Sequence, residues 1–161
     1  MVQDKNEILY FGNDSGILIF DGIQWERVAT EPDRSVNSLA LDDLGFILVG
    51  AQSEFGRLVQ NQEGQYQYES LLHLFEEKER DFRTIWQLQP IAQGVVICTE
   101  LSIFLYQHNT IRHLKTFPDT YNNQLFLTIG YFTSINTMVF MYSMTQVFRK
   151  SQNSRIFGKT S

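Results

Sequence analysis

The sequence predicts an all-β fold made of repeated four-stranded sheets, and three observations predict it. One pattern of short apolar runs separated by polar turns occurs about three times, in residues 8–28, 46–71 and 95–117. The spacing of about 40 residues per unit is typical of the blades of a β-propeller. Thirteen Phe, seven Tyr and two Trp supply large flat side chains that pack well between sheets. We therefore expect a partial β-propeller of about three four-stranded antiparallel blades, with an irregular C-terminal tail.

Strands are expected where short apolar runs end at Gly, Asn or Asp. In the first unit they are residues 8–11, 17–20 and 23–29, and the fourth strand is expected in the sequence before Val2, or a few residues of it. In the second unit they are 36–41, 46–49, 55–59 and 66–71, and in the third 84–89, 95–99, 102–106 and 110–116. The charge run 76–80 between the last two units is expected to be a solvated loop or one helical turn.

Residues 1–120 are expected to form the partial propeller, and residues 121–161 an incomplete fourth unit followed by a divergent tail. A strand is expected over 123–130, after which the turn pattern ends, as in a chain that is truncated or shifted in reading frame. Residues 121–148 contain no charge and would be long enough to span a bilayer. Their many Asn, Gln, Thr and Ser residues favour the strand interpretation.

The composition argues against several classes of function. A net charge of −5 and a pI near 5.1 argue against a nucleic-acid-binding surface, which needs clustered Lys and Arg. Cys98 is alone and is expected to be a small apolar core residue. His73, His108 and His113 lack the spacing of metal ligands, and no nucleophile motif is present. We therefore expect no enzyme activity, no metal and no cofactor.

Polar side chains recur at equivalent turns of the three units. They follow the second strand of each unit or precede the first strand of the next: Asn13, Asp14, Arg34, Gln52, Glu54, Arg83 and Glu100. In a four-stranded blade these turns lie at the same ends of the strands, so a rim that binds a hydroxyl-rich or amide-rich ligand is expected. The alternative is that they serve turns and solubility. Trp25 and Trp86 are expected in the core or between blades rather than as sugar platforms.

Residues 3–22, QDKNEILYFGNDSGILIFDG, resemble the two-component regulator propeller repeat, and residues 39–58, LALDDLGFILVGAQSEFGRL, have the same pattern. With residues 81–86 they are similar to the propeller sensor portions of bacterial receptors that also carry a triple-tyrosine module. The resemblance covers about residues 2–117. It implies a non-catalytic sensor module for a small-molecule or glycan ligand. It also implies further blades and a membrane-linked output domain, often a histidine kinase.

The same resemblance places the parent receptor on the periplasmic side of the inner membrane. The first residues, MVQDKNEILYFG, lack the basic and apolar regions of a signal peptide, so the chain as written is expected in the cytoplasm. Two alternative functions remain open. One is a fragment of a carbohydrate-active propeller enzyme, with Glu54 and Glu100 as its acid–base candidates. The other is a truncated, non-functional remnant that exposes the apolar flanks of its outer blades.

Overall fold

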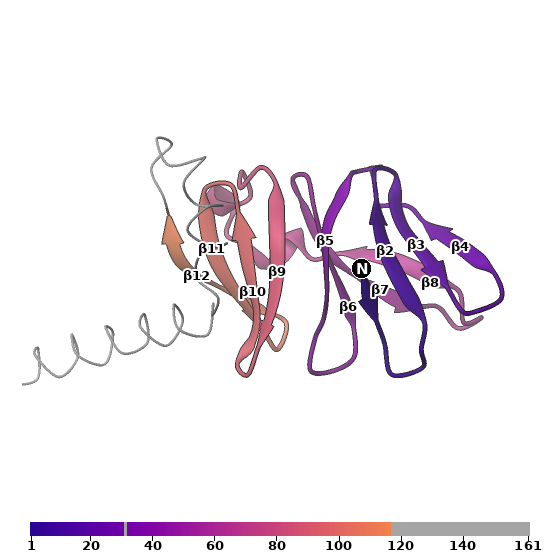
Figure 1. Ribbon diagram of the computed structural model, residues 1–161. Helices are drawn as coiled ribbons and strands as arrows, with labels where there is room; N and C mark the ends of the chain where they lie inside the picture. Colours follow the sequence, from indigo (N-terminus) through magenta and orange to yellow (C-terminus); the bar gives the residue numbers. More distant parts are fainter. Residues whose placement is uncertain (31, 117–161) are drawn as a thin grey trace, which may run out of the picture. The chain divides into compact units, whose positions relative to one another are not determined.

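The computed structural model describes residues 1–30 and 32–116, and these form an all-β fold. Twelve strands make three four-stranded antiparallel sheets, and in each sheet consecutive strands pair as a meander (Figure 1). The expectations of an all-β fold and of three four-stranded sheets are confirmed. Residues 121–161, with the expected fourth unit and the uncharged segment, lie outside the described residues. Within the described part, no helix is long and apolar enough to cross a membrane.

In the first sheet, aspartate side chains accept hydrogen bonds from the backbone N–H groups of their own turns. Its strands are β1 (Val2–Gln3), β2 (Leu9–Asn13), β3 (Gly16–Phe20) and β4 (Trp25–Val28). Asp4 Oδ1 accepts from the backbone N–H groups of Asn6 and Ile8 between β1 and β2. Asp21 does the same for the two residues that precede β4. These Asx turns explain why short polar segments are enough to reverse the chain.

The second sheet follows the same plan with longer strands. They are β5 (Val36–Leu41), β6 (Ile47–Ala51), β7 (Glu54–Gln60) and β8 (Tyr66–Ser70). Asp42 Oδ1 accepts from the N–H groups of Leu44 and Phe46, and Asn61 Oδ1 plays the same part between β7 and β8. β6 is buried along its whole length, as expected for a strand covered on both faces.

The third sheet comes after a linking segment that holds two 3-10 turns. The elements are η1 (Leu72–Leu74), η2 (Glu77–Glu79), β9 (Ile85–Ile91), β10 (Gly94–Thr99), β11 (Ser102–Gln107) and β12 (Thr110–Thr116). The charge run lies mostly in solvent and includes η2, as expected. Leu71, Phe75 and Phe82 of the same segment are buried in the core. The link is therefore anchored by apolar side chains on both sides of its charges.

The cross-strand register makes the three sheets equivalent residue by residue. The corresponding pairs between second and third strands are Gly12–Ile17, Gly50–Phe55 and Cys98–Ile103. By this register, Tyr10, Ile17 and Ile19 lie on one face of the first sheet, and Ile47, Val49 and Leu58 lie on the opposite face of the second. These six side chains are buried in one cluster between the two sheets.

The second and third sheets repeat this arrangement. Leu48 and Phe55, on the other face of the second sheet, are buried with the corresponding face of the third: Val95, Ile97, Phe104 and Tyr106. β5 accordingly lies against β2 of the first sheet, and β9 against β5 and β6 of the second (Figure 1). Each sheet after the first thus covers the preceding one through equivalent residues.

A glycine of the second strand lies where the first strand of the next sheet crosses it. A Cβ atom on Gly12 would lie 2.5 Å from the carbonyl oxygen of Val36, and one on Gly50 would lie 2.5 Å from Cγ2 of Ile85. Real Cβ atoms essentially never approach so closely, so both crossings depend on the missing side chain. In the third sheet the equivalent residue is Cys98, which is buried as expected.

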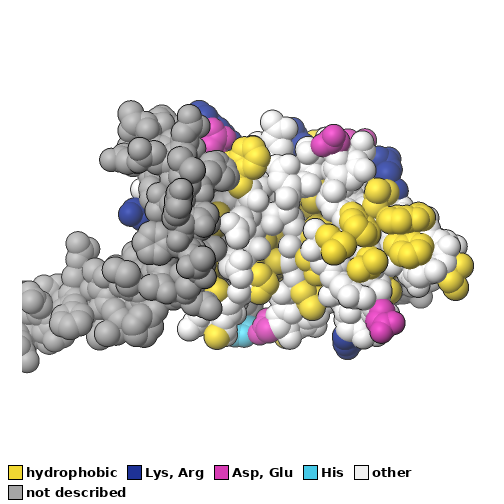
Figure 2. All heavy atoms as spheres, viewed as in Figure 1, with side chains coloured by type: hydrophobic (Ala, Val, Ile, Leu, Met, Phe, Trp, Pro, Cys, Tyr) yellow, Lys and Arg dark blue, Asp and Glu magenta, His cyan; other side chains and the backbone are white. Residues whose placement is uncertain are grey.

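One face of the first sheet carries a group of partly exposed apolar side chains, seen in Figure 2. By register, Leu9, Phe11 and Phe20 of this free face correspond to the residues through which the second and third sheets pack on their neighbours. Trp25 stacks on Phe20 with ring centroids 4.7 Å apart, yet it is 59% exposed. Trp86 is 43% exposed, so neither tryptophan lies in the core, and the alternative that they pack between blades stays a prediction.

Candidate functional site

The predicted site residues lie where the second strand of each sheet turns into the third. The segments that lead into β5 and β9 reach the same ends of the strands. We call this end of the strands the rim and define it by Asp14, Arg34, Ser35, Gln52, Ser53, Arg83, Thr84 and Glu100. The meander places these turns together because every second reversal of the chain falls at the same end of the strands.

Hydrogen bonds join the rim across the first and second sheets. Ser35 Oγ donates to Asp14 Oδ1 over 3.1 Å, which ties the β2–β3 turn to the start of β5. The backbone N–H of Gln52 donates to the carbonyl oxygen of Ser35 over 3.3 Å. Asp14, Ser35 and Gln52 therefore form one connected group, which includes two of the predicted site residues.

A second connected group spans the second and third sheets. The backbone N–H of Ser53 donates to the carbonyl oxygen of Arg83, and Gln52 and Thr84 form an isolated antiparallel bridge. Arg83 Nη1 lies 3.1 Å from Glu100 Oε1, and the Glu100 N–H donates to Thr84. Because Gln52 belongs to both groups, the rim is continuous from the first sheet to the third.

The backbone of the rim is locally strained. Ser53 has φ = 53° and Arg83 has φ = 60°, so both occupy the left-handed region that costs free energy for residues other than glycine. Their backbones are joined by the Ser53–Arg83 hydrogen bond that links the two sheets. Non-glycine residues held in this conformation tend to cluster at binding sites. The strain therefore singles out this junction within the rim.

Arg34 has a buried side-chain donor without a partner among the described residues. Its backbone N–H donates to Thr30 Oγ1 over 2.7 Å, which fixes the segment before β5. Its side-chain Nε is buried, and none of the described residues supplies an acceptor for it. Buried donors are nearly always satisfied, so an acceptor of another origin is expected at this position.

Two of the predicted residues are engaged elsewhere. Asn13 folds onto its own turn, where its side-chain oxygen accepts from the Ser15 N–H over 3.0 Å. Glu54 is only 4% exposed, and its Oε1 accepts from Tyr68 OH at 3.0 Å and Ser70 Oγ at 2.6 Å on β8. Burial, then the charge of Glu54 and the hydrogen bond to it, raises the pKa of Tyr68 far above its usual range. Glu54 therefore lies in an internal network and Glu100 in an ion pair with Arg83.

Ser35, Ser53 and Thr84 join the rim although the sequence reasoning did not include them. Each lies next to a predicted residue, and Ser35 and Thr84 directly precede the first strands of their sheets. For Ser35 and Thr84, this position directly before a first strand was the signal in the sequence that could have identified them. No group of three or more potential metal ligands is found in residues 1–30 and 32–116. The proposed ligand-binding role of the rim stays a prediction.

No family model matches the sequence, and no curated protein or solved structure is significantly similar to it.

Proposed function

We propose that this chain is a ligand-sensing segment of a β-propeller of the two-component regulator type and is not catalytic by itself. One observation carries the proposal: successive four-stranded meanders cover one another through equivalent residues. Sheets repeated in this way are the building plan of a propeller. The repeat in the sequence therefore corresponds to a repeat in packing as well as in strand order.

The free face of the first sheet supports the same proposal. Phe11, Phe20 and Trp25 form a partly exposed aromatic group where the second and third sheets have buried contacts. Exposed apolar patches of this kind mark surfaces that take a partner. In a propeller the partner is a further four-stranded sheet that presents aliphatic side chains like Ile17 and Ile19.

The rim is the proposed ligand site. Arg34 and Arg83 offer guanidinium donors, while Asp14 and Glu100 offer acceptors, on one continuous edge. This mixture suits a small molecule or glycan rich in hydroxyl or amide groups. A ligand that contacts neighbouring sheets would favour one geometry of their junction, which a membrane-linked output domain could then detect.

A ligand screen on the purified full chain tests the proposal. Monosaccharides, oligosaccharides and small amides are added while the thermal unfolding midpoint, Tm, is recorded. We expect at least one compound to raise Tm in a saturable manner, because binding to the folded state stabilises it. Arg34→Met and Arg83→Met should abolish the increase. Glu26→Gln, on the exposed strand β4, is the matched control and should retain it.

Two results would overturn the proposed rim site. One is a screen in which no compound raises Tm, and the other is an increase that survives in both arginine variants. Arg83→Met removes an ion pair that is about half exposed on the arginine side, so it should cost at most about 1 kcal/mol of stability. Loss of binding in this variant is thus separable from loss of folding.

A further inference from the structure

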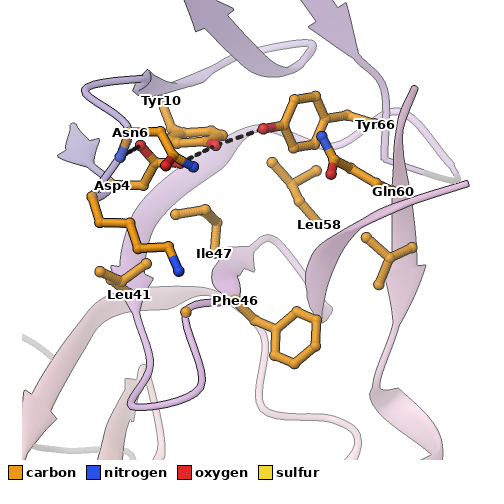
Figure 3. Close-up of a pocket in the computed structure, with 12 residues that line it drawn as sticks. Asp4, Asn6, Tyr10, Leu41, Phe46, Ile47, Leu58, Gln60 and Tyr66 are labelled. Carbon is orange, nitrogen blue, oxygen red and sulfur yellow. Dashed lines mark hydrogen bonds between the residues drawn. The ribbon is translucent and has the colours of Figure 1, made fainter. Parts of the chain in front are cut away.

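A second candidate site lies at the other ends of the strands, away from the rim. It is a pocket of about 240 Å³ between the first and second sheets. The β1–β2, β5–β6 and β7–β8 turns contribute its walls, and Figure 3 shows the side chains that point into it. One water needs about 10–15 Å³ of such volume, so the pocket has room for several. That is enough for a small organic molecule.

One wall is a fixed chain of polar groups that begins at Asp4. Asp4 Oδ1 is held by two backbone N–H groups of its own turn, and Oδ2 accepts from Tyr10 OH at 3.0 Å. Tyr10 OH lies 2.9 Å from Tyr66 OH (Figure 3). Tyr10 is 2% exposed, so its side chain is held in place by the packing around it. The Asp4–Tyr10–Tyr66 hydrogen bonds link the first sheet to the second.

The order of the hydroxyl protons in this chain follows from the chemistry. A carboxylate only accepts, so the single proton of Tyr10 is directed to Asp4. Tyr66 must then donate its proton to Tyr10. The oxygen of Tyr66 keeps only lone pairs, and it presents an acceptor to the pocket. Asp4 Oδ2 has one recorded donor and room for a second.

Hydrogen-bond donors line the pocket as well as acceptors. Lys5, Asn6 and Gln60 line the pocket with an ammonium group and two amides. Within residues 1–30 and 32–116, Lys5 forms no ion pair. The pocket therefore combines a cation and neutral donors with a separate set of acceptors.

The remaining lining is apolar. Ile47 and Leu58 are buried beneath the pocket, with Leu41 partly buried beside them. Pockets with an apolar surface and a few placed polar groups are typical of small-molecule sites. A ligand here would bury an aliphatic or aromatic group against this surface.

We propose that the pocket binds a small zwitterion with an apolar side chain, of the size and chemistry of a hydrophobic α-amino acid. The ligand's ammonium group donates to Tyr66 Oη and Asp4 Oδ2, and its carboxylate accepts from Lys5 and the amides. Its side chain packs on Leu41, Phe46 and Val59, the apolar lining residues that are only partly buried. Because both sheets line the pocket, the bound ligand also stabilises their junction. This site is independent of the ligand site proposed at the rim.

Titration calorimetry on the full chain tests the inference with L-leucine and L-phenylalanine. Three analogues each lack one feature: isocaproate has no ammonium group, isoamylamine no carboxylate, and glycine no apolar side chain. We expect leucine or phenylalanine to bind and all three analogues to bind at least about tenfold more weakly. One charged hydrogen bond is worth about that much, and so is the burial of a leucine or phenylalanine side chain.

Variants locate the binding on the pocket. Lys5→Met and Tyr66→Phe should each weaken leucine binding by about tenfold or more. Lys78→Met, which changes an exposed lysine of the linking segment, is the matched control and should bind as the wild type does. Lys5 is exposed, so its variant should fold normally even if Tyr66→Phe loosens the Asp4–Tyr10 chain.

Four outcomes would overturn the inference. The first three are that neither amino acid binds at millimolar concentration, that the analogues bind as well as leucine, and that Lys5→Met binds like the wild type. The fourth outcome is loss of leucine binding in Arg83→Met with retention in Lys5→Met, which would assign the ligand to the rim. Failure of the rim screen alone would not contradict the inference about the pocket.

Discussion

Replacing Gly50 with alanine tests how closely the second and third sheets approach. The new Cβ would lie 2.5 Å from Ile85 Cγ2, 3.2 Å from Ile85 Cβ and 3.3 Å from Leu88 Cγ. Carbon atoms prefer about 3.5–4.0 Å, so the nearest contact is short by about 1 Å. Ile85 is fully buried and has no space to retreat. The sheets must separate or the side chain must leave its rotamer, at a cost of about 1–3 kcal/mol.

The assay is equilibrium unfolding in urea, followed by circular dichroism and tryptophan fluorescence. Gly50→Ala should lower the free energy of unfolding by that amount. Ile85→Ala removes the clashing methyl but leaves a cavity, at about 2–5 kcal/mol. In the double variant alanine at position 50 fills part of that cavity. We therefore expect the double variant to be more stable than the sum predicts, by about 0.5–3 kcal/mol.

A matched control uses Gly64→Ala, in the β7–β8 turn. This glycine has φ = 79° and no atom within 4 Å of an added Cβ, so alanine there meets backbone strain but no clash. Its effect should add to that of Ile85→Ala without coupling. If Gly50→Ala proves neutral, or if it too adds to Ile85→Ala, the close crossing of β6 and β9 is not real.

Three further predictions address buried and exposed side chains. Because the pKa of Tyr68 is raised by burial and by Glu54, the folded state keeps a proton that the unfolded state loses near pH 10. Stability should therefore fall above about pH 10, and less steeply in Tyr68→Phe; parallel curves from urea titrations would refute this. Burial raises the pKa of the Cys98 thiol to about 12, so iodoacetamide should label it only after unfolding, as mass spectrometry would show. Trp25→Ser should reduce binding of the apolar dye ANS while changing stability by less than about 1 kcal/mol, since Trp25 is largely exposed; unchanged dye binding would remove the free face from the proposal.

Much of the fold could be predicted because local patterns and packing agree. The strands expected at 36–41 and 110–116 have the observed bounds, and most others differ by one or two residues. β6 runs on through Gly50 and Ala51, which are poor strand formers, because their partners on β5 and β7 complete the ladder. Those pairings are tertiary facts that a local pattern does not contain.

The rim was predictable for a topological reason, and the pocket was not. Equivalent turns of a meander share an edge, so Asp14, Gln52 and Glu100 could be grouped from spacing alone. Glu54 also belonged to that pattern, yet the β7–β8 register turns it toward Tyr68 and Ser70. The pocket depends on three turns from two sheets that meet in space, and no repeat in the sequence marks their meeting.

The last strand of each sheet is an edge strand and carries charged side chains. β4 holds Glu26 and Arg27, β8 holds Glu69, and β12 holds Arg112 and Lys115. Charged residues on a boundary strand discourage another chain from adding its own strand there. The edges formed by β4, β8 and β12 thus disfavour lateral, amyloid-like growth, and face-to-face stacking is the direction of association that these charges leave open.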